Sequence, residues 1–364
     1  MPTNQRVAIF VPKGLRTGGP EAMHQLHRSL LEEGKDSVLV PWPGMKNNKP
    51  VNEYSMYEPN WTTITRLRKS DIVVVPCDLG YLPFWYFIFI LRKNIFIWML
   101  AVDFSFEEKF KKYETRNYTL NPEWQIVKKR KKWIELISKI INLDYSKFRR
   151  RFLKIKLRIK KSNYLFQSAY AREIFRLENK TKTGLMLTDY ISLKQVNNSE
   201  KSSFCSCPRN HIAYFPGKSQ DLSQLVLEIN SMRGNLFHFI PIKNLNREQV
   251  NLLLVKADLF LDLGYFPGKD RLPRESIVLN CPVILAKRGS ARFYEDFQLT
   301  DQYLLDLALL SPNSTFEAIV KIILFGKDNN LLAQEVFKNT VFQEREIFKR
   351  EVLNFISVLE KRFQ

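Results

Sequence analysis

A strand, a glycine-bearing loop and a helix start follow one another in Leu261–Glu275, LDLGYFPGKDRLPRE. The first residues end an apolar run expected of a buried strand. Gly264 and Gly268 allow backbone amides to approach a ligand closely, and Pro273 suits the first turn of a helix. Because a helix N-terminus carries partial positive charge and N–H groups without intrahelical partners, it favours phosphate. The stretch therefore predicts a strand–loop–helix unit that binds an anion.

Charged side chains complete this loop. Lys269, Arg271 and Arg274 add full positive charge. Glu275 lies where an acid accepts hydrogen bonds from ribose hydroxyls in dinucleotide-binding folds. A pyrophosphate with an attached ribose would satisfy all of these groups together. The alternative is an ordinary turn whose charges are solvated and whose Glu275 caps the helix.

Apolar runs alternate with helical patterns on both sides of this stretch. Strands are expected at 7–11, 37–42, 71–76, 95–102, 163–167, 211–215, 236–242, 258–263 and 282–286. Between them lie helices, with Gly34 expected to end the first, Asn246 to cap another and Ser314 to open a capping box. Such alternation predicts parallel sheets covered by helices on both faces, that is, an α/β protein with two Rossmann-like domains facing across a cleft.

The segment that begins at Glu275 resembles the donor site of GT-B glycosyltransferases, in particular family 4 (the group 1 enzymes) with its Glu-x7-Glu motif. In that family a small residue, Pro, Val and Val or Ile follow the second Glu six residues later, and Cys281-Pro-Val-Ile stands at that spacing here. The resemblance implies that Glu275 holds the ribose of the nucleotide. The first Glu of the motif is replaced by Pro267, and Asp270 is the nearest carboxylate that could take its place.

The same resemblance assigns two further loops. Gly18, Gly19 and Glu21, after the first strand, match a Gly-Gly-x-Glu segment of these enzymes that faces phosphate or acceptor, although the pattern also fits a plain tight turn. Lys218, after the first strand of the second half, matches a basic residue that contacts the donor diphosphate. An exposed lysine beside a turn is an equal alternative.

Two residues are candidates for the proton acceptor. His24 could act as a base or bond an acceptor sugar, and Asp103 follows a buried strand, where it could deprotonate the acceptor hydroxyl. Cysteine spacing does not fit a zinc site, and no Asp-x-Asp pattern occurs that would hold a metal. We therefore expect neither a metal nor a cofactor, with the nucleotide-sugar as substrate.

Positive charge is concentrated in one segment of this 364-residue chain. Residues 128–161 hold fifteen Lys and Arg against two acids, or +13 of the formal +20. A basic helix with an apolar Trp and Ile face suits an anionic membrane surface. The expected surface residues are Lys128, Arg130, Lys132, Trp133, Ile137 and Arg150. The alternatives are a solvated helical hairpin and nucleic-acid binding, although no nucleic-acid motif is present and the apolar face favours lipid.

The expected domains follow from these observations. Residues 1–192 form an N-terminal Rossmann-like acceptor domain with a basic helical insertion at 105–161, and 193–208 form a linker. Residues 209–341 form a C-terminal nucleotide-sugar domain, and 342–364 a helix that packs back on the N-terminal domain. No secretory signal is visible, and Arg92 and Lys93 interrupt the longest apolar region. We expect a cytoplasmic protein, peripheral on the inner face of the membrane.

These expectations define a metal-independent hexosyltransferase. It would move a sugar from a nucleotide-sugar to a glycan or lipid-linked hydroxyl acceptor in cell-surface polysaccharide or glycolipid biosynthesis. The resemblance implies retention of anomeric configuration. Two alternatives stay open: a catalytically inactive GT-B domain that binds a sugar nucleotide or a partner, motivated by Pro267, and a nucleic-acid-binding protein that uses the basic segment.

Overall fold

The computed structural model divides into two compact units. Unit 1 holds the described residues up to Tyr190 and those from Glu344 onward, and unit 2 holds those from Ile191 to Gln343. The structure describes residues 5–41, 50–68, 70–77, 94–102, 163–179, 184–193, 210–216, 226–229, 231, 236–306 and 312–363.

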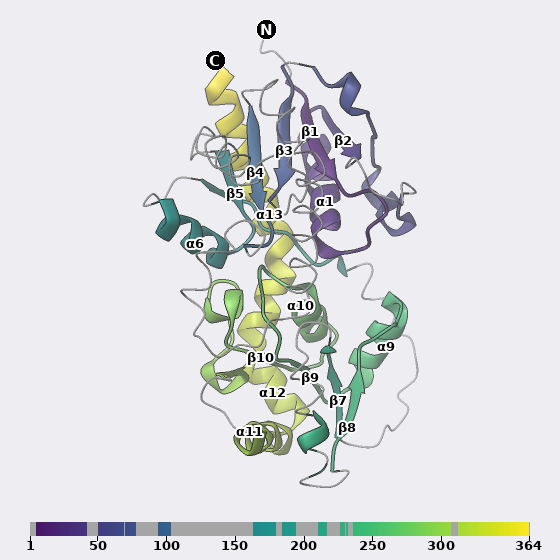
Figure 1. Ribbon diagram of the computed structural model, residues 1–364, viewed down its shortest axis with the longest axis vertical. Helices are drawn as coiled ribbons and strands as arrows, with labels where there is room; N and C mark the ends of the chain where they lie inside the picture. The colour runs from purple at the N-terminus through teal and green to yellow at the C-terminus, as the bar shows by residue number, and fades with distance from the viewer. Residues whose placement is uncertain are drawn as a thin grey trace, which may run out of the picture. The chain divides into compact units, whose positions relative to one another are not determined.

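Unit 1 is built on a six-stranded parallel sheet in the order β2-β1-β3-β4-β5-β6 (Figure 1). Its strands are β1 Val7–Val11, β2 Ser37–Pro41, β3 Ile72–Pro76, β4 Ile95–Met99, β5 Tyr164–Phe166 and β6 Leu185–Met186. Its helices are α1 Gly18–Glu32, α6 Ala169–Asn179 and the short 3-10 helices η1 Asn52–Tyr57 and η2 Ile64–Arg66. Every residue of β1, β3 and β4 is buried, which explains their unbroken apolar sequences, because both faces of a parallel sheet are covered.

Unit 2 is built on a five-stranded parallel sheet in the order β11-β10-β9-β7-β8. Its strands are β7 His211–Tyr214, β8 His238–Pro241, β9 Leu259–Asp262, β10 Val283–Ala286 and β11 Leu304–Leu305. Its helices are α9 Arg247–Lys256, α10 Arg271–Val278, α11 Pro312–Phe325, α12 Lys327–Ala333, η6 Gly289–Arg292 and η7 Asp301–Tyr303.

The last helix, α13 (Glu335–Phe363), contributes to the cores of both units. Phe337 and Val341 belong to the core of unit 2, whereas Phe348, Val352, Phe355, Ile356 and Leu359 belong to that of unit 1. In unit 1 the Glu351 carboxylate accepts hydrogen bonds from the amide and the hydroxyl of Thr188, at 2.7 and 2.8 Å. The helix begins before Phe342, where the sequence alone placed its start.

The fold class predicted from the sequence is confirmed: both sheets are parallel and carry α/β crossovers. Gly34 ends α1 at φ +72°, and Asn246 forms a capping box with Gln249. The capping box expected at Ser314 is wrong, because α11 already begins at Pro312 and places Ser314 inside its first turn. The basic insertion at 105–161 and the linker residues 194–208 lie outside the described residues.

A buried histidine in α1 makes the stability of unit 1 depend on pH. His27 is fully buried, its Nε2 accepts from the Asn60 amide at 3.2 Å, and its Nδ1 lies 3.0 Å from Ser37 Oγ. Burial lowers the pKa of His27 to about 4. Since the unfolded chain titrates near 6.5, it binds more protons than the folded chain as the pH falls, and stability is lost.

We expect this histidine alone to lower the free energy of unfolding by about 2 kcal/mol between pH 7 and pH 5. Urea unfolding of the wild type and of His27→Gln at both pH values measures the effect. The variant should show a clearly smaller fall. An equal fall in both proteins would assign the pH dependence to other groups.

Candidate functional site

The strand order of unit 2 places one loop where ligands bind in parallel α/β sheets. The chain leaves β7 toward β8 on one side and returns to β9 on the other, so the order reverses between β7 and β9. Ligands of open α/β sheets bind at the carboxyl ends of strands at such a reversal. The loop that follows β9 is Leu263–Asp270, the stretch that the sequence singled out.

A second segment holds this loop from one side. The amide of Ser290 donates to the Phe266 carbonyl at 2.9 Å, and its hydroxyl donates to the Gly268 carbonyl at 2.6 Å. Gly289 has φ +54°, and a Cβ there would lie 2.1 Å from the Phe266 oxygen. Only glycine therefore allows η6 to approach the loop this closely.

Arg274 holds the rest of the loop from inside the protein. Its side chain is fully buried, with Nε 3.1 Å from the Asp270 carbonyl and one terminal nitrogen 2.9 Å from the Lys269 carbonyl. The sequence alone placed this guanidinium among the charges that face phosphate. The structure shows that it donates to two carbonyls of the loop.

These contacts orient three consecutive amides. In a trans peptide the N–H points opposite to the carbonyl of the preceding residue. The Gly268, Lys269 and Asp270 carbonyls point to Ser290 and Arg274, so the amides of Lys269, Asp270 and Arg271 point the other way. Amides at a helix N-terminus favour an anion, and these three lie at the N-terminus of α10.

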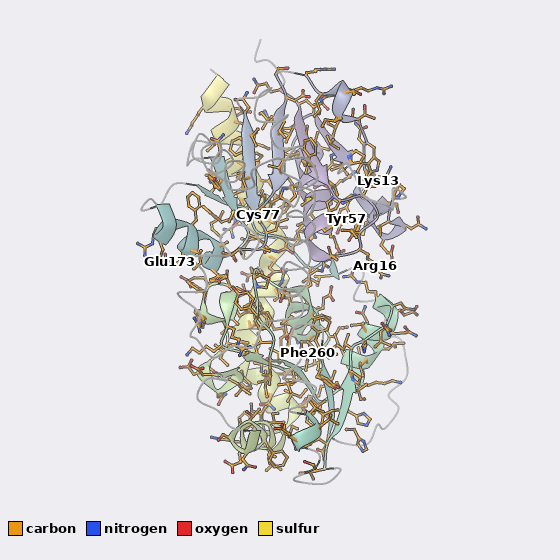
Figure 2. The ribbon with its side chains drawn as sticks, viewed as in Figure 1. Lys13, Arg16, Tyr57, Cys77, Glu173 and Phe260 are labelled. Atoms are coloured by element: carbon orange, nitrogen blue, oxygen red, sulfur yellow. The ribbon has the colours of Figure 1, made fainter. Side chains whose placement is uncertain are left out.

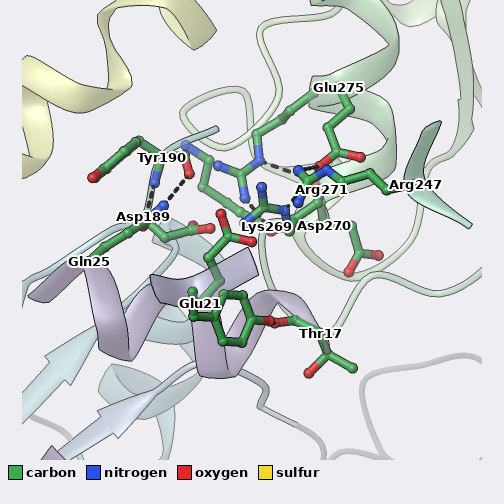
Figure 3. A network of polar contacts seen from close by, with 12 residues as sticks. Thr17, Glu21, Gln25, Asp189, Tyr190, Arg247, Lys269, Asp270, Arg271 and Glu275 are labelled. Atoms are coloured by element: carbon green, nitrogen blue, oxygen red, sulfur yellow. Dashed lines mark hydrogen bonds and ion pairs between the residues drawn. The ribbon is translucent and has the colours of Figure 1, made fainter. Parts of the chain in front are cut away.

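Glu275 lies one turn into α10 and is held by two guanidinium groups. Its Oε1 accepts from Arg247 at 2.7 Å and from Arg271 Nε at 3.1 Å (Figure 3). Burial raises the pKa of Glu275, but the positive charges of Arg271, Arg247 and Arg274 outweigh it and lower the pKa below its usual value. The buried carboxylate is therefore ionised at neutral pH and can accept hydrogen bonds from hydroxyl groups.

The other residues predicted for this site lie in the loop and at the start of α10. Lys269 is buried, and Asp270 precedes α10 as its N-cap residue without a side-chain capping bond. Pro267 is half-buried and offers no N–H. Arg271 forms an ion pair with Glu275 along one face of α10. Its positive charge therefore stabilises the carboxylate and also lies at the N-terminus of this helix.

In unit 1 the loop after β1 leads into α1, and the strand order again reverses beside it, between β1 and β3. Gly18 and Gly19 are the first two residues of α1, and Thr17 precedes them without a side-chain capping bond. Within the described part of the chain, a Cβ on Gly19 would meet only Leu100 Cδ1, at 3.7 Å, an ordinary contact. The packing of these residues therefore does not require glycine at position 19.

The 3-10 helix η1 supports this loop. Tyr54 donates to the Thr17 carbonyl at 3.0 Å, Tyr57 donates to Glu21 Oε1 at 2.9 Å, and Arg16 pairs with Glu53 at 2.9 Å. Figure 2 labels Arg16 and Tyr57 in this part of unit 1. Burial raises the pKa of Tyr57, and the charge of Glu21 raises it further, so the phenol keeps its proton. Glu21 is thus a buried carboxylate with a fixed neutral donor.

His24 lies one turn beyond these glycines, enclosed by aromatic rings. Its Nδ1 donates to the Pro20 carbonyl at 2.8 Å, and its ring centroid is 4.6 Å from that of Tyr54 and 5.7 Å from that of Trp61. Burial lowers the pKa of His24, so the imidazole is neutral and its lone pair is on Nε2.

Several predicted residues lie outside the described residues, namely Asp103, Lys218, Lys128, Arg130, Lys132, Trp133, Ile137 and Arg150. Sequence reasoning missed Arg247 and the tyrosines of η1. Arg247 follows the Asn246 cap that the sequence identified, and this cap was the available signal. No feature of the sequence marks η1. Its tyrosines lie between the predicted strands and helices, and their contacts with α1 are visible only in the structure.

The described residues contain no cluster of three or more His, Cys, Asp or Glu placed to hold a metal ion. Among the same residues, no helix is long and apolar enough to cross a membrane.

No protein-family model matches the sequence, and no curated protein sequence matches it. Solved structures do share its fold along almost the whole chain. One is sucrose-phosphate synthase from Thermosynechococcus elongatus, with 12% identity, a TM-score of 0.59 and 99% of each chain covered. The chain thus has the two-domain parallel α/β fold of GT-B glycosyltransferases.

Other similar structures contain uridine nucleotides. Anabaena HepE in complex with UDP and glucose has 9% identity and a TM-score of 0.60, over 97% of this chain and 100% of that one. UDP-GlcNAc 2-epimerase from Neisseria meningitidis bound to UDP-GlcNAc has 10% identity and a TM-score of 0.52, over 96% and 100%. Since one fold serves a synthase and an epimerase, the reaction must be argued from the site.

Proposed function

We propose that this protein is a glycosyltransferase that moves a sugar from a nucleotide-sugar donor to a hydroxyl acceptor. The observation that carries the proposal is the ionised, buried Glu275 beside three oriented amides at the start of α10. The carboxylate suits ribose hydroxyls and the amides suit a diphosphate, and a nucleotide-sugar presents both. That HepE was solved with UDP-glucose on the same fold supports this choice of ligand.

The proposed chemistry is electrostatic. When the sugar leaves, negative charge grows on the diphosphate, and preorganised donors that face this charge lower the barrier. The amides of Lys269, Asp270 and Arg271, the Lys269 ammonium and, by analogy, Lys218 would supply that stabilisation without a metal. Arg274 keeps the amides in place, so no reorganisation is needed during the reaction.

A donor panel tests the proposal. The purified protein is incubated with UDP-, GDP-, ADP-, CMP- and dTDP-sugars, and both thermal stabilisation and release of free nucleotide are measured. A donor at a hundred times its Kd should add about 2.7 kcal/mol of stability. Stabilisation with turnover supports a transferase, stabilisation without turnover supports the inactive binding domain that Pro267 motivates, and neither response to any donor would refute both.

Unit 1 would supply the acceptor side through Gly18, Gly19 and Glu21. Because the described residues leave room for a Cβ at Gly19, Gly19→Ala should keep the free energy of unfolding or raise it by up to about 1 kcal/mol through higher helix propensity. If a substrate approaches this backbone closely, the added methyl group should lower kcat/KM about a hundredfold. A variant that is as active as the wild type would remove the glycine pair from the site.

Three proton acceptors stay in the proposal: Asp103, His24 through Nε2, and Asp270. The pH profile of kcat for Asp103→Asn, His24→Gln and Asp270→Asn separates them. Only loss of the residue that acts as the base removes the fall in kcat at low pH. Retention of anomeric configuration is proposed from the family resemblance. NMR of the first-formed product decides it.

The acceptor is proposed to be a glycan or lipid-linked molecule at the inner membrane face, as the charge of residues 128–161 indicates. Sedimentation with vesicles of phosphatidylcholine, with and without 30% phosphatidylglycerol, tests the membrane contact. We expect binding to anionic vesicles only, weakened by salt. Salt-sensitive binding to RNA, without vesicle binding, would favour the nucleic-acid alternative instead.

A further inference from the structure

Arg247 contacts Glu275 from a separate helix. It is the first residue of α9, where the Asn246 side chain accepts from the Gln249 amide and Gln249 Oε1 accepts from the Asn246 amide, both at 2.9 Å. This reciprocal pair fixes where α9 begins, and with it the backbone from which Arg247 reaches Glu275 Oε1 at 2.7 Å. Figure 3 shows the Arg247 and Arg271 side chains meeting at the carboxylate.

The two arginines hold Glu275 in different ways. Arg271 lies on the same helix, four residues earlier, so it constrains the carboxylate only relative to α10. Arg247 lies on α9 and therefore ties the carboxylate to a second element. Both bonds end on Oε1, and within the part of the chain that the structure describes no hydrogen bond reaches Oε2. The Glu275 side chain is 9% exposed.

We propose that Arg247 is a positioning residue that makes the donor site selective for ribonucleotides over 2′-deoxyribonucleotides. This inference rests on the proposed function. By holding Oε1, Arg247 turns Oε2 toward the nucleotide as a fixed acceptor for the ribose 2′-hydroxyl. A 2′-deoxyribonucleotide lacks this hydroxyl. On binding it displaces water from the charged Oε2 but donates no hydrogen bond in return, so it binds roughly tenfold to a hundredfold more weakly.

Removal of Arg247 should abolish the selectivity. The carboxylate keeps Arg271 but loses its anchor on α9, so it can swing away from the sugar. Ribonucleotide affinity then falls, 2′-deoxyribonucleotide affinity changes little, and the ratio of the two approaches one. General damage to the site would lower both affinities by the same factor, so the ratio separates a positioning role from a structural one.

Calorimetric titrations with UDP, GDP and ADP, and with dUDP, dGDP and dADP, test the proposal. The best ribonucleotide and its 2′-deoxy partner are measured on the wild type, Arg247→Met, Arg247→Lys and Lys256→Met, the last removing an exposed charge from the other end of α9. We expect the ratio of ribonucleotide to 2′-deoxyribonucleotide affinity to be above ten for the wild type and Lys256→Met, and about one for Arg247→Met. Arg247→Lys should give an intermediate value, because lysine keeps the positive charge but not the planar guanidinium.

Each other outcome overturns the inference in a recognisable way. A wild type that binds both sugars equally, or an unchanged ratio in a folded Arg247→Met, refutes the role of Arg247 while the donor site stands. If Arg247→Met does not fold, an unchanged ratio in Arg247→Lys does the same. A wild type that binds none of the six nucleotides refutes this inference, and it refutes the proposed function as well if the CMP- and dTDP-sugars of the donor panel also fail to stabilise the protein.

Discussion

Glu275→Ala is expected to lose the stabilisation that the best nucleotide-sugar gives to the wild type. The substitution removes the acceptor proposed for the ribose and leaves Arg247 and Arg271 facing each other without the carboxylate between them. Removing one partner of a buried ion pair costs about 3–5 kcal/mol, so the free energy of unfolding should fall by roughly this amount. Urea unfolding and thermal shift with saturating donor measure the two effects.

Two variants make this result specific. Glu275→Gln keeps the shape and one acceptor oxygen, so it should fold better than Glu275→Ala but still bind donor at least about tenfold more weakly, because the charge is lost. Glu248→Ala removes an exposed acid next to Arg247 and should behave as the wild type. Donor stabilisation of Glu275→Ala equal to that of the wild type would show that the ribose lies elsewhere.

Arg274→Met is expected to affect stability and donor binding at once. The variant preserves much of the apolar stem but removes the guanidinium that donates to the Lys269 and Asp270 carbonyls. The Asp270 carbonyl, at the N-cap, also accepts the first backbone bond of α10, so we count the loss of one buried hydrogen-bond partner and expect the free energy of unfolding to fall by about 1–3 kcal/mol. With its carbonyls released, the loop can turn its amides away from the diphosphate.

The matched control for this prediction is Arg345→Met, which removes an exposed arginine from α13. It should change neither stability nor donor binding beyond about 0.5 kcal/mol. If Arg274→Met loses stability but keeps the affinity of the wild type for donor, the orientation of the three amides is not maintained by Arg274. That result would weaken the diphosphate site while leaving the fold unaffected.

Local sequence predicted the parallel α/β fold because each strand carries its own signal. Val7–Val11 and Ile72–Pro76 are continuous apolar runs, and such runs occur where both faces of a strand are covered. The loop before α10 was equally visible, since its glycines, basic residues and Glu275 are contiguous in the chain. Strand order was not visible, because pairing between β7 and β9 joins residues far apart in sequence.

The parts of the site that sequence missed depend on such distant contacts. The Asn246 cap marks where α9 begins, but it does not indicate that Arg247 meets Glu275, which is 28 residues away in the chain. No feature near Arg274 shows that it donates to the loop carbonyls. Charge alone placed Arg274 toward phosphate, because a basic residue at a helix start usually faces solvent. In the structure this guanidinium donates to the Lys269 and Asp270 carbonyls, a contact that the charge pattern alone does not reveal.

The central claim is that the start of α10 binds the ribose and diphosphate of a nucleotide-sugar. A crystal structure of the wild type with the nucleoside diphosphate that stabilises it best tests this most directly. We predict ribose hydroxyl oxygens at hydrogen-bond distance from Glu275 Oε2 and phosphate oxygens on the amides of Lys269, Asp270 and Arg271. A nucleotide bound elsewhere, with Glu275 and these amides uncovered, would contradict the account.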